Sequence, residues 1–312
     1  MLLSAPEPWI MAAALGLALL IDVLWGEPPA WLHPVVGMGK YLGLWQGCLP
    51  ALQPASAFVA GALLWLLGAV TVGALAWLAQ GYLLQTLPAF GAVLLLALLL
   101  KPLLAWRMLG EEVQAVEAAL GASLAAGRAR LGWLVSRDVT QLSETEVRES
   151  AIESLAENLN DSLVAPLFWF ALLGLPGAAI YRFANTADAM WGYRGRWEWA
   201  GKWAARADDV LSWLPARFTA LLLALAQGGL SLRILRTEAR HTPSPNSGWP
   251  MAAMALALGV TLRKPGVYVL HGHGRAVEAA DTARAVALAW RVVWLTAGLV
   301  SVMVMGVQGI QI

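Results

Sequence analysis

Long apolar runs alternate with charged stretches along this chain, and several runs have the length of membrane-spanning helices. A spanning helix needs about 20 predominantly apolar residues. No charged residue occurs between Lys40 and Lys101, and this interval predicts two spans, at residues 57–79 and 87–106. A third uncharged run covers residues 292–312.

Four other apolar stretches are either short or interrupted: residues 10–25, 163–181, 218–232 and 251–262. Asp22 interrupts the first of them, and Pro166 and Pro176 interrupt the second. We therefore expect an all-α, polytopic integral membrane protein with about four to six membrane segments, some of them broken or re-entrant. No internal repeat is evident, so we expect a single membrane-embedded domain over residues 1–312.

The distribution of basic residues predicts the orientation of these segments, because Lys and Arg are enriched in cytoplasmic loops. Residues 107–162 hold five arginines, whereas the turn at 81–86 has no basic residue. Residues 182–212 are also basic, so both basic segments are expected to be cytoplasmic helical loops. That arrangement requires residues 163–181 to be broken or re-entrant, since a single crossing would separate the two loops.

Composition supports a membrane protein and excludes several classes of function. The chain is 59% hydrophobic and only 13% charged, whereas soluble domains have about 25% charged residues. A net charge of +1 gives no sign of nucleic-acid binding. Cys48 is the single cysteine, so an intrachain disulfide is excluded. The sequence has neither a G-x-x-x-x-G-K-[ST] loop nor an H-E-x-x-H motif.

A row of acidic residues precedes one of the apolar runs, in the stretch "RESAIESLAENLNDSLVAPLFWF" (148–170). A capping box at Ser143–Glu146 predicts that a helix begins there. At 3.6 residues per turn, one side of that helix has the following residues: Glu149, Glu153, Glu157, Asn160 and Asp161.

This acidic face has two interpretations. It is either the solvated side of an amphipathic helix or a functional site. The acids lack Lys or Arg partners four residues on, and they run into an apolar segment, where ionisable groups are expensive and usually functional. Carboxylates with a carboxamide suit Mg²⁺ shared with substrate phosphates. A proton relay would use similar residues.

A second polar cluster lies in "YRFANTADAMWGYR" (181–194). Asn185 and Asp188 share a helical face, and Arg182 and Arg194 are near them in sequence. This pattern indicates either a cation–phosphate cluster or a polar loop with a helix cap.

Three smaller polar stretches are also candidates. Arg217 follows "DDVLSWLPA", where juxtamembrane capping is the alternative. Asn246 and Ser247 could orient a ligand or form a turn, and His33 has either a structural or a ligand-binding role. Residues 267–275, "VYVLHGHGR", predict a short strand followed by a glycine loop.

Five strings together resemble the CobD/CbiB family of cobalamin biosynthesis: "DVLWGEPPAWLHPVVGMG", "SRDVTQL", "AIESLAENLNDSLVAPLFWFALLGLPGAAIYRFANTADAMWGYR", "DDVLSWLPARFTALLL" and "PNSGWPMAAMALALGVTLRKPGVY". They occur in the family's order between Asp22 and about Tyr268. The resemblance implies an adenosylcobinamide-phosphate synthase, a multi-pass enzyme of the cell inner membrane with its active site facing the cytoplasm. It would join adenosylcobyric acid to aminopropanol, or its O-phosphate, through an amide bond, with consumption of ATP and Mg²⁺.

This resemblance turns the clusters into hypotheses about individual roles. The metal ligands would be Glu153, Glu157, Asn160 and Asp161. The catalytic residues would be Glu153, Glu157, Asp188, Arg137 and Arg217. Substrate or phosphate would be bound by Arg182, Asn185, Arg194, Asn246, Ser247 and His33. Trp191 and Trp249 could stack on the corrinoid, with interfacial anchoring as the alternative.

The expected partners are the two substrates and the lipid bilayer, with no nucleic acid. A homo-oligomer, or a complex with other late membrane enzymes of the pathway, is also compatible with the sequence. Two other functions remain open. One is a non-catalytic membrane sensor or accessory protein on the same scaffold. The other is a transporter, for which we would expect paired broken helices in repeat-related positions.

Overall fold

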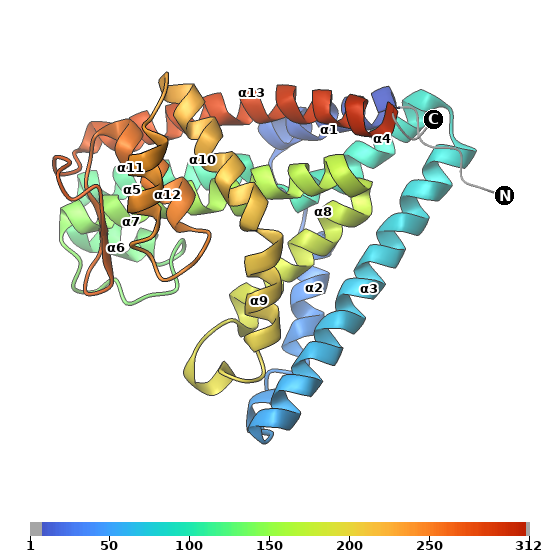
Figure 1. Cartoon of the computed structure of the whole chain (residues 1–312), viewed down its shortest axis with the longest axis horizontal. Coiled ribbons are helices and arrows are strands. Elements are labelled where there is room, and N and C mark those ends of the chain that lie inside the picture. The colour runs from blue at the N-terminus through green and yellow to red at the C-terminus, as the bar shows by residue number, and fades with distance from the viewer. Residues whose placement is uncertain (1–7, 310–312) are drawn as a thin grey trace. The chain divides into compact units, whose positions relative to one another are not determined.

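The computed structural model describes residues 8–309, and this part of the chain is mainly helical (Figure 1). The α-helices are α1 (Pro8–Trp25), α2 (Pro34–Gly43), α3 (Pro54–Thr86), α4 (Ala89–Leu100), α5 (Trp106–Ala122), α6 (Leu124–Leu131), α7 (Glu144–Leu159), α8 (Ala165–Trp191), α9 (Lys202–Leu211), α10 (Trp213–Gln227), α11 (Leu232–Ala239), α12 (Gly248–Leu258) and α13 (Ala279–Gly309). Short 3₁₀ segments are η1 (Leu49–Ala51), η2 (Lys101–Leu103) and η4 (Gly195–Trp197), and η3 (Asn160–Val164) is a π-helical turn. Two strands, β1 (Leu262–Lys264) and β2 (Tyr268–Leu270), pair antiparallel with Leu262 opposite Leu270.

The helices form two compact units. The first contains the described parts of Met1–Ala105, Ala165–Ser212 and Ala297–Ile312, and the second contains Trp106–Val164 and Trp213–Thr296. Each unit is assembled from segments that are distant in sequence. The expectation of one domain over the whole chain stays a prediction.

Five described helical stretches are long and apolar enough to cross a membrane: Pro8–Trp25, Pro54–Thr86, Ala89–Ala122, Glu144–Trp191 and Ala279–Gly306. A sixth is counted if α9 and α10 form one broken span. The prediction of an all-α, polytopic membrane protein is therefore confirmed. The helices include the predicted runs at 10–25 and 57–79 and the described part of the run at 292–312; residues 310–312 lie outside the described residues. The predicted run at 87–106 corresponds to α4, η2 and the first residue of α5, and its helix begins only at Ala89.

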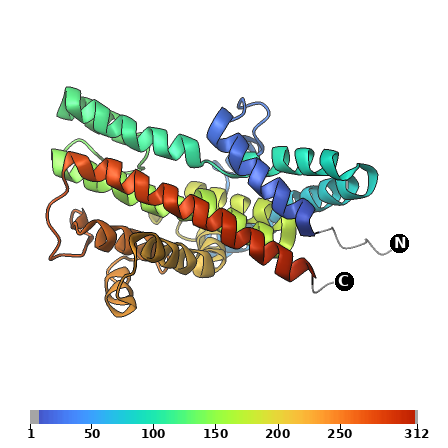
Figure 2. The ribbon, with the colours of Figure 1, turned by 90° about the horizontal axis from the view of Figure 1, so that it is seen from above.

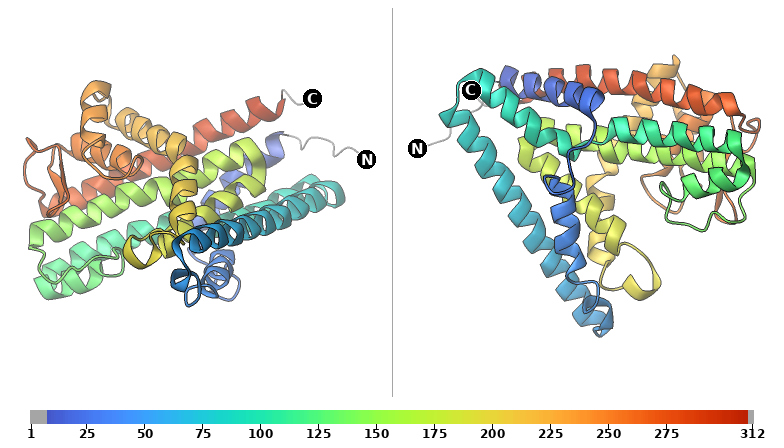
Figure 3. Two further views of the ribbon diagram at one scale, coloured as in Figure 1. Left: turned by 60° about the horizontal axis from the view of Figure 1, so that its bottom comes forward. Right: turned by 180° about the vertical axis from the view of Figure 1, so that it is seen from behind.

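In the first unit, α3 packs along α8 and α9, and α1 packs along α4 (Figure 3). Small residues allow these close approaches, as is common between membrane helices. A Cβ at Gly61, Gly68 or Gly73 of α3 would collide with the backbone of Ala200, the ring of Phe183 or the side chain of Ile180.

The apolar part of α8 is interrupted, as its prolines predicted, but the break lies at Gly174 rather than at Pro166. Gly174 has φ 69° and ψ −157°, and Pro176 follows inside the helix. The backbone N–H of Leu175 donates to Gln80 Oε1 of α3 at 2.7 Å. A broken backbone inside the membrane requires such a partner, since lipid supplies no hydrogen bonds.

The second unit consists mainly of α5, α7, α10, α11 and α12, with the β1–β2 hairpin and the first part of α13. Figure 2 shows α5 and α7 side by side, and α7 also packs on α12 and β1. The predicted run at 218–232 is shorter in the structure, because Gly228 and Gly229 adopt φ of 96° and 119° after α10 ends at Gln227. The predicted run at 251–262 is likewise shortened, because α12 ends at Leu258 and Gly259 adopts a left-handed conformation before β1.

Candidate functional site

The acidic helix α7 begins where its sequence predicts. The Ser143 N–H donates to Glu146 Oε2 at 2.7 Å, and the Glu146 N–H donates to Ser143 Oγ at 3.3 Å, which completes a capping box. The helix continues to Leu159 and then widens into the π-turn η3. Such turns occur frequently at functional sites.

The acidic row of α7 is partly buried, so the interpretation as a solvated surface is wrong for two of its members. Glu149 and Glu153 are 0% and 3% exposed. Each has a basic partner from a segment distant in sequence: Arg263 Nε donates to Glu149 Oε1 at 3.1 Å, and Arg137 Nη2 donates to Glu153 Oε2 at 3.2 Å. Buried charges are tolerated when they are paired in this way.

Burial also changes the proton affinity of these groups, which lie in the charged first part of the stretch Glu144–Trp191, before the apolar part that begins at Ser162 and could cross a membrane. Desolvation raises the pKa of Glu149 to about 7, against the opposing effect of Arg263. Desolvation likewise raises the pKa of Glu153, with Arg137 acting in the opposite direction. The pKa of Tyr268 is raised by burial and by the nearby Glu153 carboxylate. Carboxyl groups with raised pKa values are suited to accept and release protons near neutral pH.

A cavity of about 170 Å³ lies against this face of α7. Its ionisable and hydroxyl-bearing lining residues are Ser136, Arg137, Ser150, Glu153, Ser154, Glu157, Lys264 and Tyr268. Glu153 Oε1 is buried, and among the described residues it has no hydrogen-bond partner at full bonding geometry, although the Tyr268 hydroxyl interacts with the same carboxyl group. We call this space the ionic cavity. It combines two carboxylates with two basic groups, a lining that is complementary to a small molecule with both an ammonium and a phosphate.

The structure gathers only part of the predicted metal-binding set. Glu153 and Glu157 line the ionic cavity, whereas Asn160 and Asp161 do not. The Asn160 side chain accepts from the Thr219 hydroxyl at 3.0 Å and donates to Asp161 Oδ1 at 2.7 Å. The π-turn that begins at Asn160 changes the angular spacing of the side chains, which accounts for the separation.

No group of three or more His, Cys, Asp or Glu side chains within residues 8–309 could hold a metal ion without other ligands. The residues do fit the usual protein site for Mg²⁺, which takes one or two carboxylates and completes its coordination with water and substrate phosphate. Glu153 and Glu157 are the pair that would supply them, and this role stays a prediction.

Arg217 and Asn246 are in direct contact, in the second unit. Arg217 Nη1 donates to Asn246 Oδ1 at 2.9 Å and Nη2 donates to the carbonyl of Pro245 at 3.1 Å. Its guanidinium lies between the rings of Trp213 and Trp249, at 4.3 and 4.9 Å from their centroids. Ser247 is next to this group in sequence, and its backbone N–H donates to Ser244 Oγ. These contacts hold Arg217 in one orientation.

The second predicted cluster belongs to the first unit. Arg182, Asn185 and Asp188 lie on one half-buried face near the end of α8, and Arg182 Nη1 donates to Asn185 Oδ1 at 3.4 Å. The alternative of a polar loop is therefore wrong for these three residues. Arg194 is exposed and follows the helix, just before η4. Their binding and catalytic roles stay predictions.

An ionic cluster in the first unit was not predicted from the sequence. Lys101 is 3% exposed and its Nζ lies 2.9 Å from Glu27 Oε2 and 3.4 Å from Asp22 Oδ1. His33 Nε2 lies 3.1 Å from the same Glu27 oxygen. This places His33 within the ionic cluster. A signal was present, because an acid inside one apolar run and a lysine ending another are the residues that membrane proteins pair.

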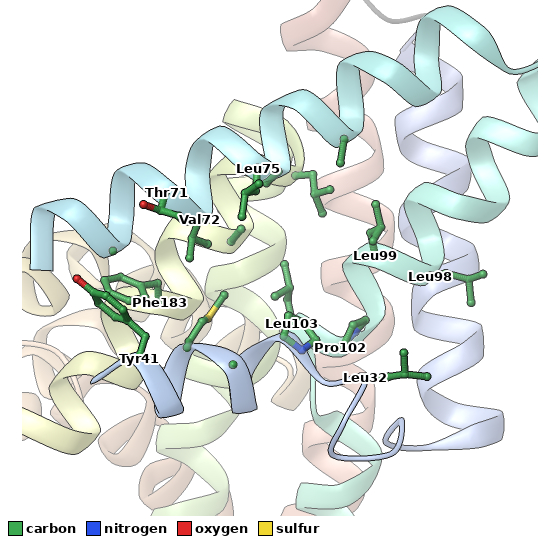
Figure 4. Close-up of a pocket in the computed structure, with 18 residues that line it drawn as sticks. Leu32, Tyr41, Thr71, Val72, Leu75, Leu98, Leu99, Pro102, Leu103 and Phe183 are labelled. Carbon is green, nitrogen blue, oxygen red and sulfur yellow. The ribbon is translucent and has the colours of Figure 1, made fainter. Parts of the chain in front are cut away.

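The first unit also contains an apolar cavity of about 550 Å³ between α2, α3, α4, η2 and α8 (Figure 4). Tyr41 and Thr71 contribute hydroxyls, and these donate to the backbone carbonyls of Leu64 and Leu67. Most of the remaining lining is aliphatic, so this cavity is unsuited to phosphate chemistry.

Trp191 is placed neither to stack on a corrinoid nor to anchor the chain at a membrane interface, because its side chain is fully buried. The residue is 0% exposed, and its ring stacks on Trp197 with centroids 5.8 Å apart and an interplanar angle of 12°. Trp249 contacts Arg217 as described above, and its role toward a ligand stays a prediction.

The helices and the cavity indicate the class of protein: a polytopic α-helical membrane protein with a small ionic cavity. Comparison with known proteins identifies the family. The model of the CobD/Cbib protein family matches residues 15–293, and the chain belongs to that family.

Curated relatives match over nearly their whole length. A "Probable cobalamin biosynthesis protein CobD" of Pyrococcus furiosus is 39% identical over 288 residues, which are 91% of this chain and 95% of the relative. A "Cobalamin biosynthesis protein CobD" of Chromobacterium violaceum is 41% identical over 307 residues, with coverage of 92% and 95%. One of Brucella suis is 38% identical, with coverage of 93% and 96%. No solved structure matches the chain.

Proposed function

We propose that this protein catalyses an amide-forming step of cobalamin biosynthesis. In this proposal it joins a carboxylate of adenosylcobyric acid to aminopropanol or its O-phosphate, with ATP and Mg²⁺, and releases adenosylcobinamide or its phosphate. Support comes from the family, from the names of relatives that match over 91% to 93% of this chain, and from the chemistry of the ionic cavity. The site would lie on the cytoplasmic side of the inner membrane, where ATP is available.

One observation carries the proposal furthest. Glu153 is 3% exposed, and its Oε2 is held by Arg137, whereas among the described residues its Oε1 has no hydrogen-bond partner at full bonding geometry, with only the Tyr268 hydroxyl interacting with the same carboxyl group. A buried acceptor without a partner is costly unless it binds a ligand. The cavity of about 170 Å³ is too small for a corrinoid and falls below the usual size of a drug-binding pocket. It therefore suits the small amine rather than the macrocycle.

The residues of the cavity have separable roles in this reaction. Arg137 and Lys264 line the same cavity as the two carboxylates and would bind the phosphate of aminopropanol phosphate. Glu153 would bind the ammonium and position it, which leaves the Glu157 carboxylate to hold Mg²⁺ together with substrate phosphate. Glu153 Oε1 would then accept a proton, so that the amine nitrogen becomes a nucleophile.

The bond changes follow the usual order for a carboxylate that must be activated. The γ-phosphoryl group of ATP is transferred to the cobyric acid carboxylate, which releases ADP. The amine nitrogen, which has already given one proton to Glu153, then attacks the acyl carbon, and inorganic phosphate leaves and takes up the second proton of the nitrogen. Bound Mg²⁺ would neutralise phosphate charge during the transfer.

Substitution of Glu153 tests this role. We expect Glu153→Gln to lower kcat by at least about 10²-fold, because a positioned general base contributes roughly 10² to 10⁴. Glu157→Gln should likewise abolish measurable turnover while membrane insertion persists. Product is measured by mass spectrometry with purified protein in lipid nanodiscs.

The matched control is Glu111→Gln, which removes an exposed carboxylate from a surface pair with Arg107. It should stay within about twofold of the wild-type rate, since exposed pairs contribute little. If Glu153→Gln and Glu157→Gln keep full activity while all variants insert and unfold alike, the roles given to these two residues are wrong.

A further inference from the structure

A second cavity of the second unit has a strongly basic lining, distinct from that of the ionic cavity. It has a volume of about 610 Å³ and is bordered by the start of α10, by α11 and by the loop that precedes α12. Arg217, Arg236 and Arg240 line it together with Trp213 and Trp249, and no Asp or Glu is among its described lining residues. We call it the arginine cavity.

The three arginines differ in how they are held. Arg217 is fixed by its bonds to Asn246 and Pro245 and by the two tryptophan rings. Arg236 and Arg240 are exposed; Arg236 lies in the last turn of α11, and Arg240, four residues on, is the C-cap residue that follows the helix. Within the described part of the chain, neither of their guanidinium groups has a hydrogen bond or an ion pair. The cavity therefore presents two uncompensated guanidinium groups beside a third that is held in place.

This lining predicts the chemistry of a ligand. Guanidinium groups bind phosphate oxygens in a bidentate manner, and two cations without partners are suited to a polyanion. Trp213 is 51% exposed and offers an aromatic surface at the same cavity. Flat bases stack on such surfaces. The volume lies within the usual range for small-molecule and cofactor sites.

We propose that the arginine cavity binds a nucleoside triphosphate, with its phosphates on Arg236 and Arg240 and its base against Trp213. This inference rests on the proposed function, because that function consumes ATP although the sequence has no G-x-x-x-x-G-K-[ST] loop. It names a site for the co-substrate that does not depend on such a loop.

A phosphate group could also come from a lipid. Leu232 and Ile234 of α11 are 60% and 50% exposed, and an apolar face beside arginines is a feature of interfacial helices. The nucleotide is favoured because the cavity also contains the two tryptophans and the fixed Arg217. The experiment must separate the two sources.

Equilibrium binding of a fluorescent ATP analogue tests the site without any corrinoid. The purified protein is placed in nanodiscs of pure phosphatidylcholine, and unlabelled ATP and pyrophosphate are the competitors. We expect Arg236→Gln and Arg240→Gln each to raise Kd about tenfold, the effect of losing a hydrogen bond to a charged group. Arg233→Gln is the matched control on the same helix, because Arg233 is exposed but does not line the cavity; it should change Kd by less than about twofold.

A second arm measures retained phosphatidylglycerol in nanodiscs that contain it. If Arg236→Gln and Arg240→Gln reduce lipid retention but leave the Kd for the ATP analogue unchanged, a lipid headgroup is the ligand and the proposal is overturned. The proposal is also overturned if wild-type protein does not bind the ATP analogue, or if Arg233→Gln weakens binding as much as the other two variants do.

Failure of this inference can be distinguished from failure of the proposed function. If wild-type protein binds ATP through Arg236 and Arg240 but makes no amide, the nucleotide site is supported and the ligase function is refuted. If wild-type protein makes the amide, but Arg236→Gln and Arg240→Gln leave the KM for ATP unchanged, the ligase function is supported and the nucleotide site is refuted.

Discussion

The sequence predicts the acidic row of α7 but not its ion pairs, although Arg137 was itself among the predicted catalytic residues. A helical wheel places Glu149 and Glu153 on one face of α7, and this face is correct. Their partners, Arg263 and Arg137, come from β1 and from the loop before α7, at sequence separations of 114 and 16 residues. Helical periodicity describes neighbours three and four residues apart, so it has no information about such contacts. Lys264 and Tyr268 of the ionic cavity were missed for the same reason.

Glu149 makes the stability of the protein depend on pH. Its pKa of about 7 in the folded state exceeds the ordinary value of 4.5, so the folded state keeps a proton that the unfolded state has released between these values. The free energy of unfolding therefore falls as pH rises from about 4.5 through about 7, and the loss is complete above that range. We expect Glu149→Gln to flatten this part of the dependence, measured as the thermal midpoint in detergent from pH 4.5 to pH 8.5.

Glu111→Gln serves as the control here too, because its side chain is 62% exposed and it should keep the wild-type slope. A slope for Glu149→Gln equal to that of wild type would show that Glu149 does not titrate with a raised pKa.

Among the elements, α8 shows both what a pattern predicts and where it fails. Two prolines predicted an interruption of the apolar run, and an interruption is present. Its position follows from a contact that the local pattern does not contain, since Gln80 of α3 accepts the hydrogen bond from Leu175 and faces Gly174. The break is thus fixed by packing between α3 and α8 and not by proline alone.

Gly174 should tolerate no side chain. Its φ of 69° lies in the left-handed region, and a Cβ would lie 2.5 Å from Gln80 Oε1. We expect Gly174→Ala to lower the free energy of unfolding by about 1–3 kcal/mol from the strained backbone alone, with further loss from the clash. The thermal midpoint of the purified protein in detergent measures this loss of stability.

Gly16→Ala is the comparison for this variant, because Gly16 lies in α1 and a Cβ there meets nothing within 4 Å. It should be neutral or slightly stabilising, since Ala is the better helix former. Equal midpoints for the two alanine variants would contradict the described break.

At the scale of the whole molecule, the predicted spans agree with the helices because span length and hydropathy are local properties. The division into two units could not be predicted, because each unit combines segments far apart in the chain. The cluster of Lys101, Asp22 and Glu27 illustrates this limit, since it joins the ends of two apolar runs separated by about 75 residues.

Removal of Lys101 should destabilise the first unit. Lys101→Met leaves Asp22 and Glu27 without their buried cation, and breaking a buried pair costs about 3–5 kcal/mol. Lys202→Met is the control, because Lys202 pairs with the exposed Glu198 at 3.9 Å and should cost at most about 1 kcal/mol. Denaturation in detergent measures the stability of both variants.

The double variant Asp22→Asn, Lys101→Met should recover part of the lost stability. If Lys101→Met is no less stable than Lys202→Met, the buried cluster does not contribute as described.

Conversion of adenosylcobyric acid by the purified protein tests the central claim most directly. The protein in nanodiscs is incubated with adenosylcobyric acid, aminopropanol phosphate, ATP and Mg²⁺, and the corrinoid products and ADP are quantified by mass spectrometry. We expect adenosylcobinamide phosphate and ADP in equal amounts, with no product when ATP, Mg²⁺ or the amine is omitted. Absence of amide product from protein that is folded and membrane-inserted, or formation of product without consumption of ATP, would contradict it.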